Sequence, residues 1–195
     1  AEVNFKKKTK KMYKVNSQAV ELMAKYCLKE NKHLVQASGT IVNGNHKTYS
    51  HKTKIQPVNE YGKSKLMAEK IINKYKFKKT ILRFGGIYGK NGPQHLSLNK
   101  FIKNAIEGKN IIFLGNPKSK RNYVYVNDAA KIILKVIKKK IYGTYYVGGE
   151  VQNFEQMLKK IKLIINKKSR IVFKFTNEKT FDQIIINSRI FKTST

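Results

Sequence analysis

Residues 60–86 read EYGKSKLMAEKIINKYKFKKTILRFGG and join a helical pattern to a short apolar strand that two glycines close. We expect the helix over about residues 61–75 and the strand, TILRF, over residues 80–84. An apolar strand that follows a helix directly is typical of a parallel sheet whose faces are covered by helices. The stretch therefore predicts an α/β fold.

The same alternation of helix and strand continues on both sides of this stretch. The other expected elements are helices over 15–31, 97–107, 128–139 and 154–165, and strands over 33–38, 111–114, 144–147 and 170–175. Asn127 is placed to cap the helix that follows it, and the polar residues 45–58 predict a long loop. The first helix is expected to bury one apolar face, formed by Ala19, Leu22, Met23, Tyr26 and Cys27.

Composition limits the class of protein. The chain has 195 residues, of which 41% are hydrophobic, and this is enough for one globular domain with a core. Lys and Arg total 42 against 11 acidic residues, a net charge of +31. Arginine occurs at only four positions, and the other 38 basic residues are lysines spread along the chain. Since arginine is the residue that reads phosphates and bases bidentately, nucleic-acid binding is not the expected main role.

Other classes of site are disfavoured by what the sequence contains. No apolar run approaches the roughly 18 residues that a membrane span requires. A single cysteine, Cys27, excludes a disulfide framework, and the four histidines show no metal-ligand spacing, so no metal site is expected. A reducing, cytoplasmic setting is the simplest interpretation.

Tyr61 and Lys65 are the strongest candidates for chemistry. On a helix they lie four residues apart and share a face, where a lysine ammonium would lower the pKa of the phenol. A tyrosine prepared in this way can exchange a proton near neutral pH. Ser38 and Thr40 lie at the C-terminal end of the expected strand over 33–38, where α/β folds bind ligands. The alternatives are a surface Tyr–Lys pair, and hydroxyls that only satisfy backbone groups in a turn.

With these features in place, the chain from about Asn16 onward resembles the extended short-chain dehydrogenase/reductases, specifically the NAD-dependent epimerase/dehydratase group that acts on nucleotide sugars. The resemblance rests on the order and spacing of several segments. They are LVQASGTIVNG (34–44), EYGKSKLMAEKII (60–72), ILRFGGIYG (81–89), RNYVYVNDAAKIIL (121–134), GTYYVGGE (143–150) and FDQIIINSRIFKTST (181–195).

The resemblance implies a mechanism and a set of site residues. Tyr61 would be the acid/base on a sugar hydroxyl, Lys65 would hold the nicotinamide ribose of NAD or NADP, and Ser38 or Thr40 would hydrogen-bond the same hydroxyl. Hydride transfer would give a keto-sugar that is epimerised, dehydrated or reduced. Arg121 would bind the nucleotide diphosphate, unless it is an ordinary surface cation, and Gly86 would line the substrate site. The family often has Asn at the positions of Gly86 and Tyr146.

The resemblance also implies that a part of the family's fold is missing. No glycine-rich turn precedes Asn16, so we expect a partial Rossmann-like parallel sheet that lacks its first βαβ unit. The expected organisation is one truncated domain, with residues 16–140 in the Rossmann-like core and residues 141–195 on the substrate side. The strand over 33–38 would then be an unprotected sheet edge.

Three roles remain open at this point. The chain is an enzyme part that binds a nucleotide sugar and needs a cofactor half, from a separate chain or within a homodimer. Alternatively, it is a catalytically silent remnant of such an enzyme. The third possibility is a basic module that binds anions or nucleic acid, whose binding would fall steeply with added salt.

Overall fold

A three-stranded parallel sheet forms the centre of the larger part of the molecule. The computed structural model describes residues 2–174, 182–188 and 191. The strand order is β1 (Leu34–Gly39), β3 (Lys79–Phe84), β8 (Gly143–Val147). From Thr80 onward every residue of β3 is buried, because β3 lies between two strands and two helical layers. The expected parallel α/β fold is confirmed.

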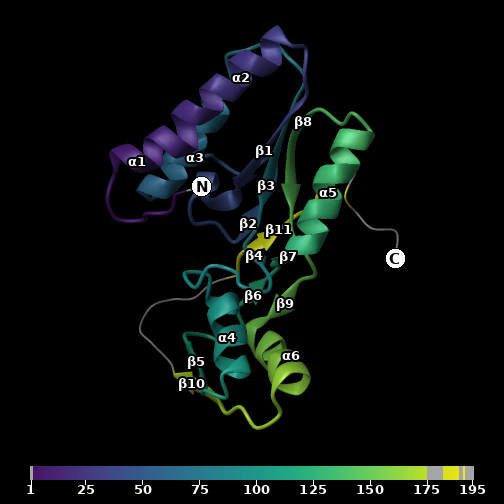
Figure 1. Cartoon of the computed structure of the whole chain (residues 1–195). Coiled ribbons are helices and arrows are strands. Elements are labelled where there is room, and N and C mark those ends of the chain that lie inside the picture. The colour runs from purple at the N-terminus through teal and green to yellow at the C-terminus, as the bar shows by residue number, and fades with distance from the viewer. Residues whose placement is uncertain (1, 175–181, 189–190, 192–195) are drawn as a thin grey trace.

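Helices cover both faces of this sheet (Figure 1). On one side lie α1 (Lys10–Tyr13), the π-helical turn η1 (Lys14–Gln18), α2 (Ala19–Lys29) and α3 (Glu60–Asn73). On the other side lies α5 (Val126–Lys138), which packs its apolar face against Val35, Leu82 and Val147. Successive strand residues point to opposite faces, so Val35 faces α5 whereas Ser38 faces α3.

The small lobe has a core of its own below the sheet. It pairs β5 (Ile111–Leu114) with β10 (Ile171–Lys174) and covers them with α4 (Ser97–Ile106) and α6 (Phe154–Ile165). Phe101, Phe113 and Phe154 pack their rings together in this core. Asn153 starts α6 with a capping box to Gln156, which satisfies the free N–H groups of the first turn.

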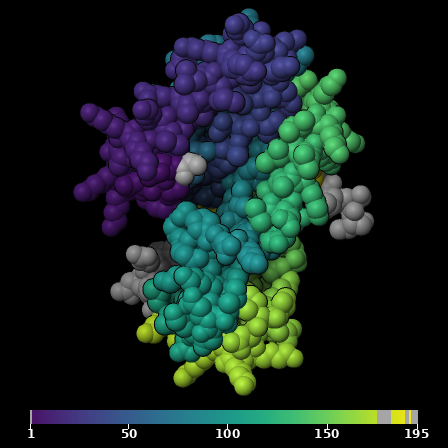
Figure 2. Space-filling view, viewed as in Figure 1, coloured from purple at the N-terminus to yellow at the C-terminus, as the bar shows by residue number. Residues whose placement is uncertain are grey.

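Short strand pairs connect the sheet to the small lobe. They are β2 (Thr48–Tyr49) with β11 (Ile184–Ile185), β4 (Ile87–Tyr88) with β7 (Val124–Tyr125), and the antiparallel pair β6 (Lys120–Arg121) with β9 (Gln152–Asn153). The 3-10 turn η2 (Thr40–Asn43) follows β1 directly. Figure 2 shows the larger part, with the N-terminal segment in purple, above the small lobe in teal and yellow-green.

The expected division of the chain at residue 140 has to be redrawn. Strand β8, at residues 143–147, is an integral strand of the large sheet. Helix α4 and strand β5, at residues 97–114, belong to the small lobe. The two parts therefore interleave along the chain, because each core takes helices and strands from both sides of residue 140.

Three local expectations were wrong. Helical structure begins at Lys10, where Thr9 caps it, and not near residue 15. Helix α5 begins at Val126 after Tyr125, so Asn127 lies inside the first turn and does not cap it. Helix α2 buries Ala24 and Cys27, because the helix packs through its small residues. Four of the five residues of the expected core face are exposed, namely Ala19, Leu22 (70% exposed), Met23 and Tyr26.

Candidate functional site

A cavity of about 520 Å³ lies where β1 and β3 end and the connecting strands begin. Its volume is within the range of small-molecule sites. Five of the six residues expected from the sequence line it: Ser38, Thr40, Tyr61, Gly86 and Arg121. Lys65 is not among the residues that line the cavity. The tertiary structure thus brings together residues from four separate segments of the chain.

Tyr61 reaches this cavity because the start of α3 is pressed against η2. Asn59 caps the helix by accepting a hydrogen bond from the Gly62 N–H at 2.8 Å. A Cβ at Gly62 would lie 2.8 Å from the carbonyl oxygen of Ile41, so only glycine permits this approach. The close packing places Tyr61 and Thr40 on the same cavity.

The structure does not support a lowered pKa for Tyr61. Burial raises the pKa of the Tyr61 phenol above its usual value. The Lys65 ammonium instead donates a hydrogen bond to the carbonyl oxygen of Ala37 at 2.6 Å. Burial lowers the pKa of Lys65, and the charge of Glu69 partly opposes this shift. The expectation that Lys65 activates the phenol is therefore wrong for this arrangement, because the lysine is committed to a backbone group of β1.

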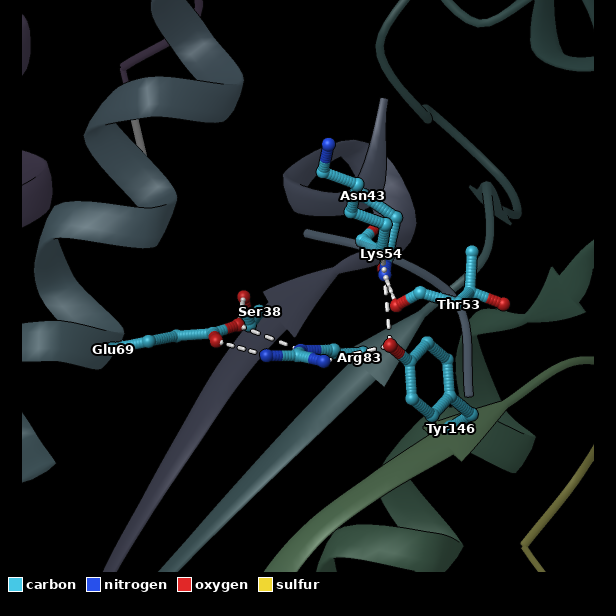
Figure 3. A network of polar contacts seen from close by, with 7 residues as sticks. All are labelled: Ser38, Asn43, Thr53, Lys54, Glu69, Arg83 and Tyr146. Atoms are coloured by element: carbon cyan, nitrogen blue, oxygen red, sulfur yellow. Dashed lines mark hydrogen bonds and ion pairs between the residues drawn. The ribbon is translucent and has the colours of Figure 1, made fainter. Parts of the chain in front are cut away.

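The hydroxyl of Ser38 is also committed. Ser38 Oγ donates to Glu69 Oε1 at 2.5 Å, on the side of β1 that faces α3 (Figure 3). The described contacts give Thr40 no comparable partner among side chains, and Thr40 lines the cavity at the first residue of η2. Of the two hydroxyls that the sequence left open, Thr40 is therefore better placed to meet a ligand.

A buried polar network holds this end of the sheet together (Figure 3). Glu69 accepts two hydrogen bonds from Arg83, whose third nitrogen donates to the Tyr146 hydroxyl at 2.7 Å. Tyr146 donates in turn to Asn43 Oδ1 at 3.1 Å. Asn43 then donates to the carbonyl oxygens of Thr53 and Lys54. Tyr146 is fully buried in this role and is not a residue of the cavity.

Gly86 and Arg121 also line the cavity. A Cβ at Gly86 would lie 2.7 Å from the ring of Tyr123 and 2.9 Å from Leu96, so the glycine is required by packing. Arg121 lies in β6, its guanidinium donates to the Lys120 carbonyl oxygen at 2.8 Å, and it sits 5.3 Å from the ring centroid of Phe154. Burial lowers the pKa of Arg121. A guanidinium held at a cavity wall can bind phosphate through two parallel hydrogen bonds.

Sequence reasoning missed the aromatic residues of this cavity. Phe5, Tyr49, His95 and Tyr123 all line it. None belongs to a helical periodic pattern, and positions in loops or two-residue strands carry no local signal of the cavity that they will join. Glu69 and Arg83 did carry a signal, because Glu69 lies four residues after Lys65 and Arg83 is one of only four arginines.

A second, larger cavity of about 850 Å³ lies between α5 and α6. None of the six expected site residues lines it, so its greater size does not make it the better candidate. Within the described ranges, no cluster of three or more His, Cys, Asp or Glu side chains could hold a metal ion. None of the helices in the described part of the chain is both long and apolar enough to cross a membrane.

Comparison with solved structures supports the fold assignment. UDP-glucuronic acid 4-epimerase from Bacillus cereus, in complex with NAD, has a TM-score of 0.79 at 18% identity, covering 94% of this chain and 63% of that one. The dTDP-4-dehydrorhamnose reductase from Bacillus anthracis, in complex with NADP, also has a TM-score of 0.79, at 22% identity, covering 97% and 70%. At these identities the likeness shows a shared fold.

Sequence comparison supports the same assignment. The uncharacterized UDP-glucose epimerase YtcB of Bacillus subtilis is 29% identical over 157 residues, which are 76% of this chain and 49% of that protein. The chain thus spans about half the length of this curated relative. The family model of the RmlD substrate binding domain matches residues 4–169. The chain therefore belongs to the RmlD substrate binding domain family, within the superfamily of extended short-chain dehydrogenase/reductases and NAD-dependent epimerases and dehydratases.

Proposed function

We propose that this chain is the catalytic and substrate-binding part of a nucleotide-sugar epimerase, dehydratase or reductase. The observation that carries the proposal is the convergence of Tyr61, Thr40 and Arg121 on one cavity of suitable size. Arg121 would bind the diphosphate of the substrate, which would direct the sugar toward the ends of β1 and β3. We place this activity in the cytoplasm, a reducing setting in which the buried Cys27 would stay a free thiol.

Tyr61 would transfer a proton to or from a sugar hydroxyl. Thr40 would hydrogen-bond the same hydroxyl and hold it toward the phenol. Because burial raises the pKa of Tyr61, the phenol is protonated at neutral pH in this arrangement and would donate its proton when a keto-sugar is reduced, whereas oxidation of a sugar hydroxyl would require the phenolate. Release of Lys65 from the Ala37 carbonyl oxygen would bring a positive charge nearer to the phenol and favour the basic form.

The residues described here fit only one part of a dinucleotide cofactor. Tyr61, and Lys65 after its release from the Ala37 carbonyl oxygen, would contact the nicotinamide ribose. Gly85-Gly86 leads into strand β4 and Gly148-Gly149 into strand β9, so neither pair opens a helix that could hold a pyrophosphate. NAD or NADP would accept or supply the hydride when bound. We therefore propose that the pyrophosphate is held by a further part of the protein, by a second copy or by a partner chain.

Mutation of Tyr61 tests this function in a protein that is completed by fusion to, or co-expression with, a cofactor-binding half. Tyr61→Phe removes only the hydroxyl, and turnover should fall by at least about 100-fold while UDP-glucose still binds. Ser38→Ala should reduce turnover less than Thr40→Val does, since the Ser38 hydroxyl is bonded to Glu69. Normal turnover in Tyr61→Phe would contradict the proposed role.

Binding measurements separate the alternatives. The chain by itself should bind NAD weakly, because the backbone N–H groups of a glycine-rich turn supply much of the pyrophosphate affinity. Saturable UDP-glucose binding without any turnover after completion would identify a silent remnant. Binding to heparin that falls steeply with salt, without a nucleotide-sugar site, would identify a basic anion-binding module.

A further inference from the structure

The N-terminal segment over residues 2–9 forms one wall of the candidate site, although it is far from the other site residues in the sequence. Val3 and Phe5 line the cavity together with Tyr61 and His95. We propose that Phe5 and His95 are specificity-determining residues, which pack against the apolar C–H face of the sugar ring of a nucleotide sugar. The inference rests on the proposed function and names the part of the substrate that these residues recognise.

The segment is fixed at three points, so Phe5 is held in place before any ligand arrives. The buried Asn16 side chain clamps the backbone of Glu2, accepting from its N–H at 2.9 Å and donating to its carbonyl oxygen at 2.8 Å. Asn4 accepts from the backbone N–H groups of Lys6 and Lys7, which makes a tight turn around Phe5. Thr9 caps α1. A preorganised aromatic residue loses little entropy on binding.

The clamp is also tied to the helix that carries Tyr61. Asn16 Nδ2 donates to Ser64 Oγ at 3.1 Å, and Ser17 Oγ donates to the Ser64 carbonyl oxygen at 3.0 Å. Ser64 lies one turn after Tyr61 on α3. Asn16 therefore joins the segment that carries Phe5 to the helix that carries Tyr61 through hydrogen bonds.

Phe5 contacts the rings of both Tyr61 and His95. Its ring centroid is 5.8 Å from that of Tyr61 at an interplanar angle of 87°, and 5.8 Å from that of His95 at 69°. Phe5 nevertheless remains 42% exposed, so much of its ring surface is free to contact a ligand. A large apolar side chain that is both anchored and exposed beside a cavity indicates a contact surface for a ligand.

The charge distribution of the cavity selects the class of ligand. Although the chain carries 42 Lys and Arg residues, Arg121 is the only one of them among the described residues that line this cavity. One guanidinium suits a diphosphate, whereas a polyanion would need several cations. Val3, Pro93 and Leu96 add apolar surface to the lining. The C–H hydrogens of a sugar ring carry partial positive charge and complement the negative face of an aromatic ring.

Calorimetric titration of the full chain with UDP-glucose and with UDP tests the proposal. The wild-type chain should bind UDP-glucose more tightly than UDP. Phe5→Leu should weaken UDP-glucose binding by about 3- to 10-fold and leave UDP binding unchanged. His95→Ala should act in the same direction, whereas Phe5→Tyr should retain the affinity. Phe77→Leu, the same change at an aromatic residue outside the cavity, is the matched control.

Each outcome bears on a different claim. Arg121→Met should weaken the binding of both ligands equally, which would identify the diphosphate contact. If UDP-glucose binds and Phe5→Leu leaves its affinity unchanged, or weakens UDP to the same extent, the inference about the sugar wall is overturned and the proposed function stands. If the wild-type chain binds neither ligand, the proposed function is overturned and the inference with it.

Discussion

Glu69 of α3 and Arg83 of β3 form a buried ion pair in which the guanidinium contacts both carboxylate oxygens, at 2.6 Å for Nη2–Oε2 and 3.1 Å for Nε–Oε1. The same carboxylate accepts a hydrogen bond from the Ser38 hydroxyl, so Glu69 joins the helix that carries Tyr61 to both β1 and β3. The pair therefore fixes the end of β1 against α3 and β3. Thr40, which lines the cavity, follows this end of β1 directly.

We predict that breaking this pair destabilises the fold strongly. Arg83→Met should lower the free energy of unfolding by about 3 to 5 kcal/mol, because it leaves a buried carboxylate without its partner. The double variant Glu69→Gln, Arg83→Met should recover part of the loss. Urea unfolding provides the measurement. Lys25→Ala, which breaks an exposed pair with Glu21, is the control and should change stability little. If Arg83→Met and Lys25→Ala lowered the free energy of unfolding by the same amount, the buried pair would contribute no more than the exposed one.

A charge cluster that is sensitive to acid should hold the segment that leads into β6, the strand of Arg121. Hydrogen bonds from Lys118 and Lys159, together with the charges of these two lysines, lower the pKa of Glu155 to about 2. A carboxyl group with a lowered pKa in the folded state stabilises the fold above its unfolded pKa, and this stabilisation is lost as the pH falls through the folded value.

We therefore expect the stability difference between wild type and Glu155→Gln to shrink as the pH is lowered from about 6 to about 2. Carboxyl NMR titration checks the cause directly. Lys118→Ala should raise the pKa of Glu155, and Lys160→Ala, at a neighbouring lysine that pairs with Glu150, should not. A Glu155 pKa near the ordinary value would contradict the geometry of the cluster.

Two glycines allow backbone strain to be separated from close packing. Gly44 has φ +80°, and a Cβ there would lie 2.2 Å from the Gln56 carbonyl oxygen. Gly108 has φ +68°, but a Cβ there would lie 3.9 Å from the nearest atom, the Asn166 side-chain nitrogen. Gly108→Ala should cost about 1 to 2 kcal/mol from strain alone. Gly44→Ala should cost about 1 to 3 kcal/mol more because it also overpacks the contact. Thermal unfolding measures both, and similar losses would contradict the close approach at Gly44.

The free edge of β1 should promote self-association. Among the described residues β1 pairs only with β3, as the sequence predicted. The Leu34 N–H donates toward β3, so alternate residues such as Val35 and Ala37 turn their backbone groups to the free side. Lys65 satisfies one of these groups, the Ala37 carbonyl oxygen. Edges without further protection pair with other chains.

We expect light scattering of the wild-type chain to rise with salt, because salt screens the repulsion between strongly basic copies. Ala37→Lys should reduce this rise, since Ala37 is exposed at the edge. Val35→Lys is less informative because Val35 packs against the core under α5. A wild-type chain that stays monomeric at high salt would show that the edge is covered.

The sequence by itself determined the α/β class, the positions of most helices and strands, and the free edge of β1. The class and the element positions follow from local periodicity and from glycines at strand ends, which the chain expresses over short distances, whereas the free edge followed from the resemblance to the family. It also singled out Tyr61, Thr40 and Arg121, which the fold places on one cavity.

Only the tertiary structure decided where polar groups point and which segments meet. The motif at 61–65 predicts a Tyr–Lys pair, yet Lys65 donates to Ala37 and Ser38 to Glu69, because a buried donor binds the acceptor that packing brings nearest. Phe5 reaches Tyr61 only because Asn16 clamps the N-terminal segment to the helix of Tyr61. Such contacts join residues far apart in the chain, and no local pattern encodes them.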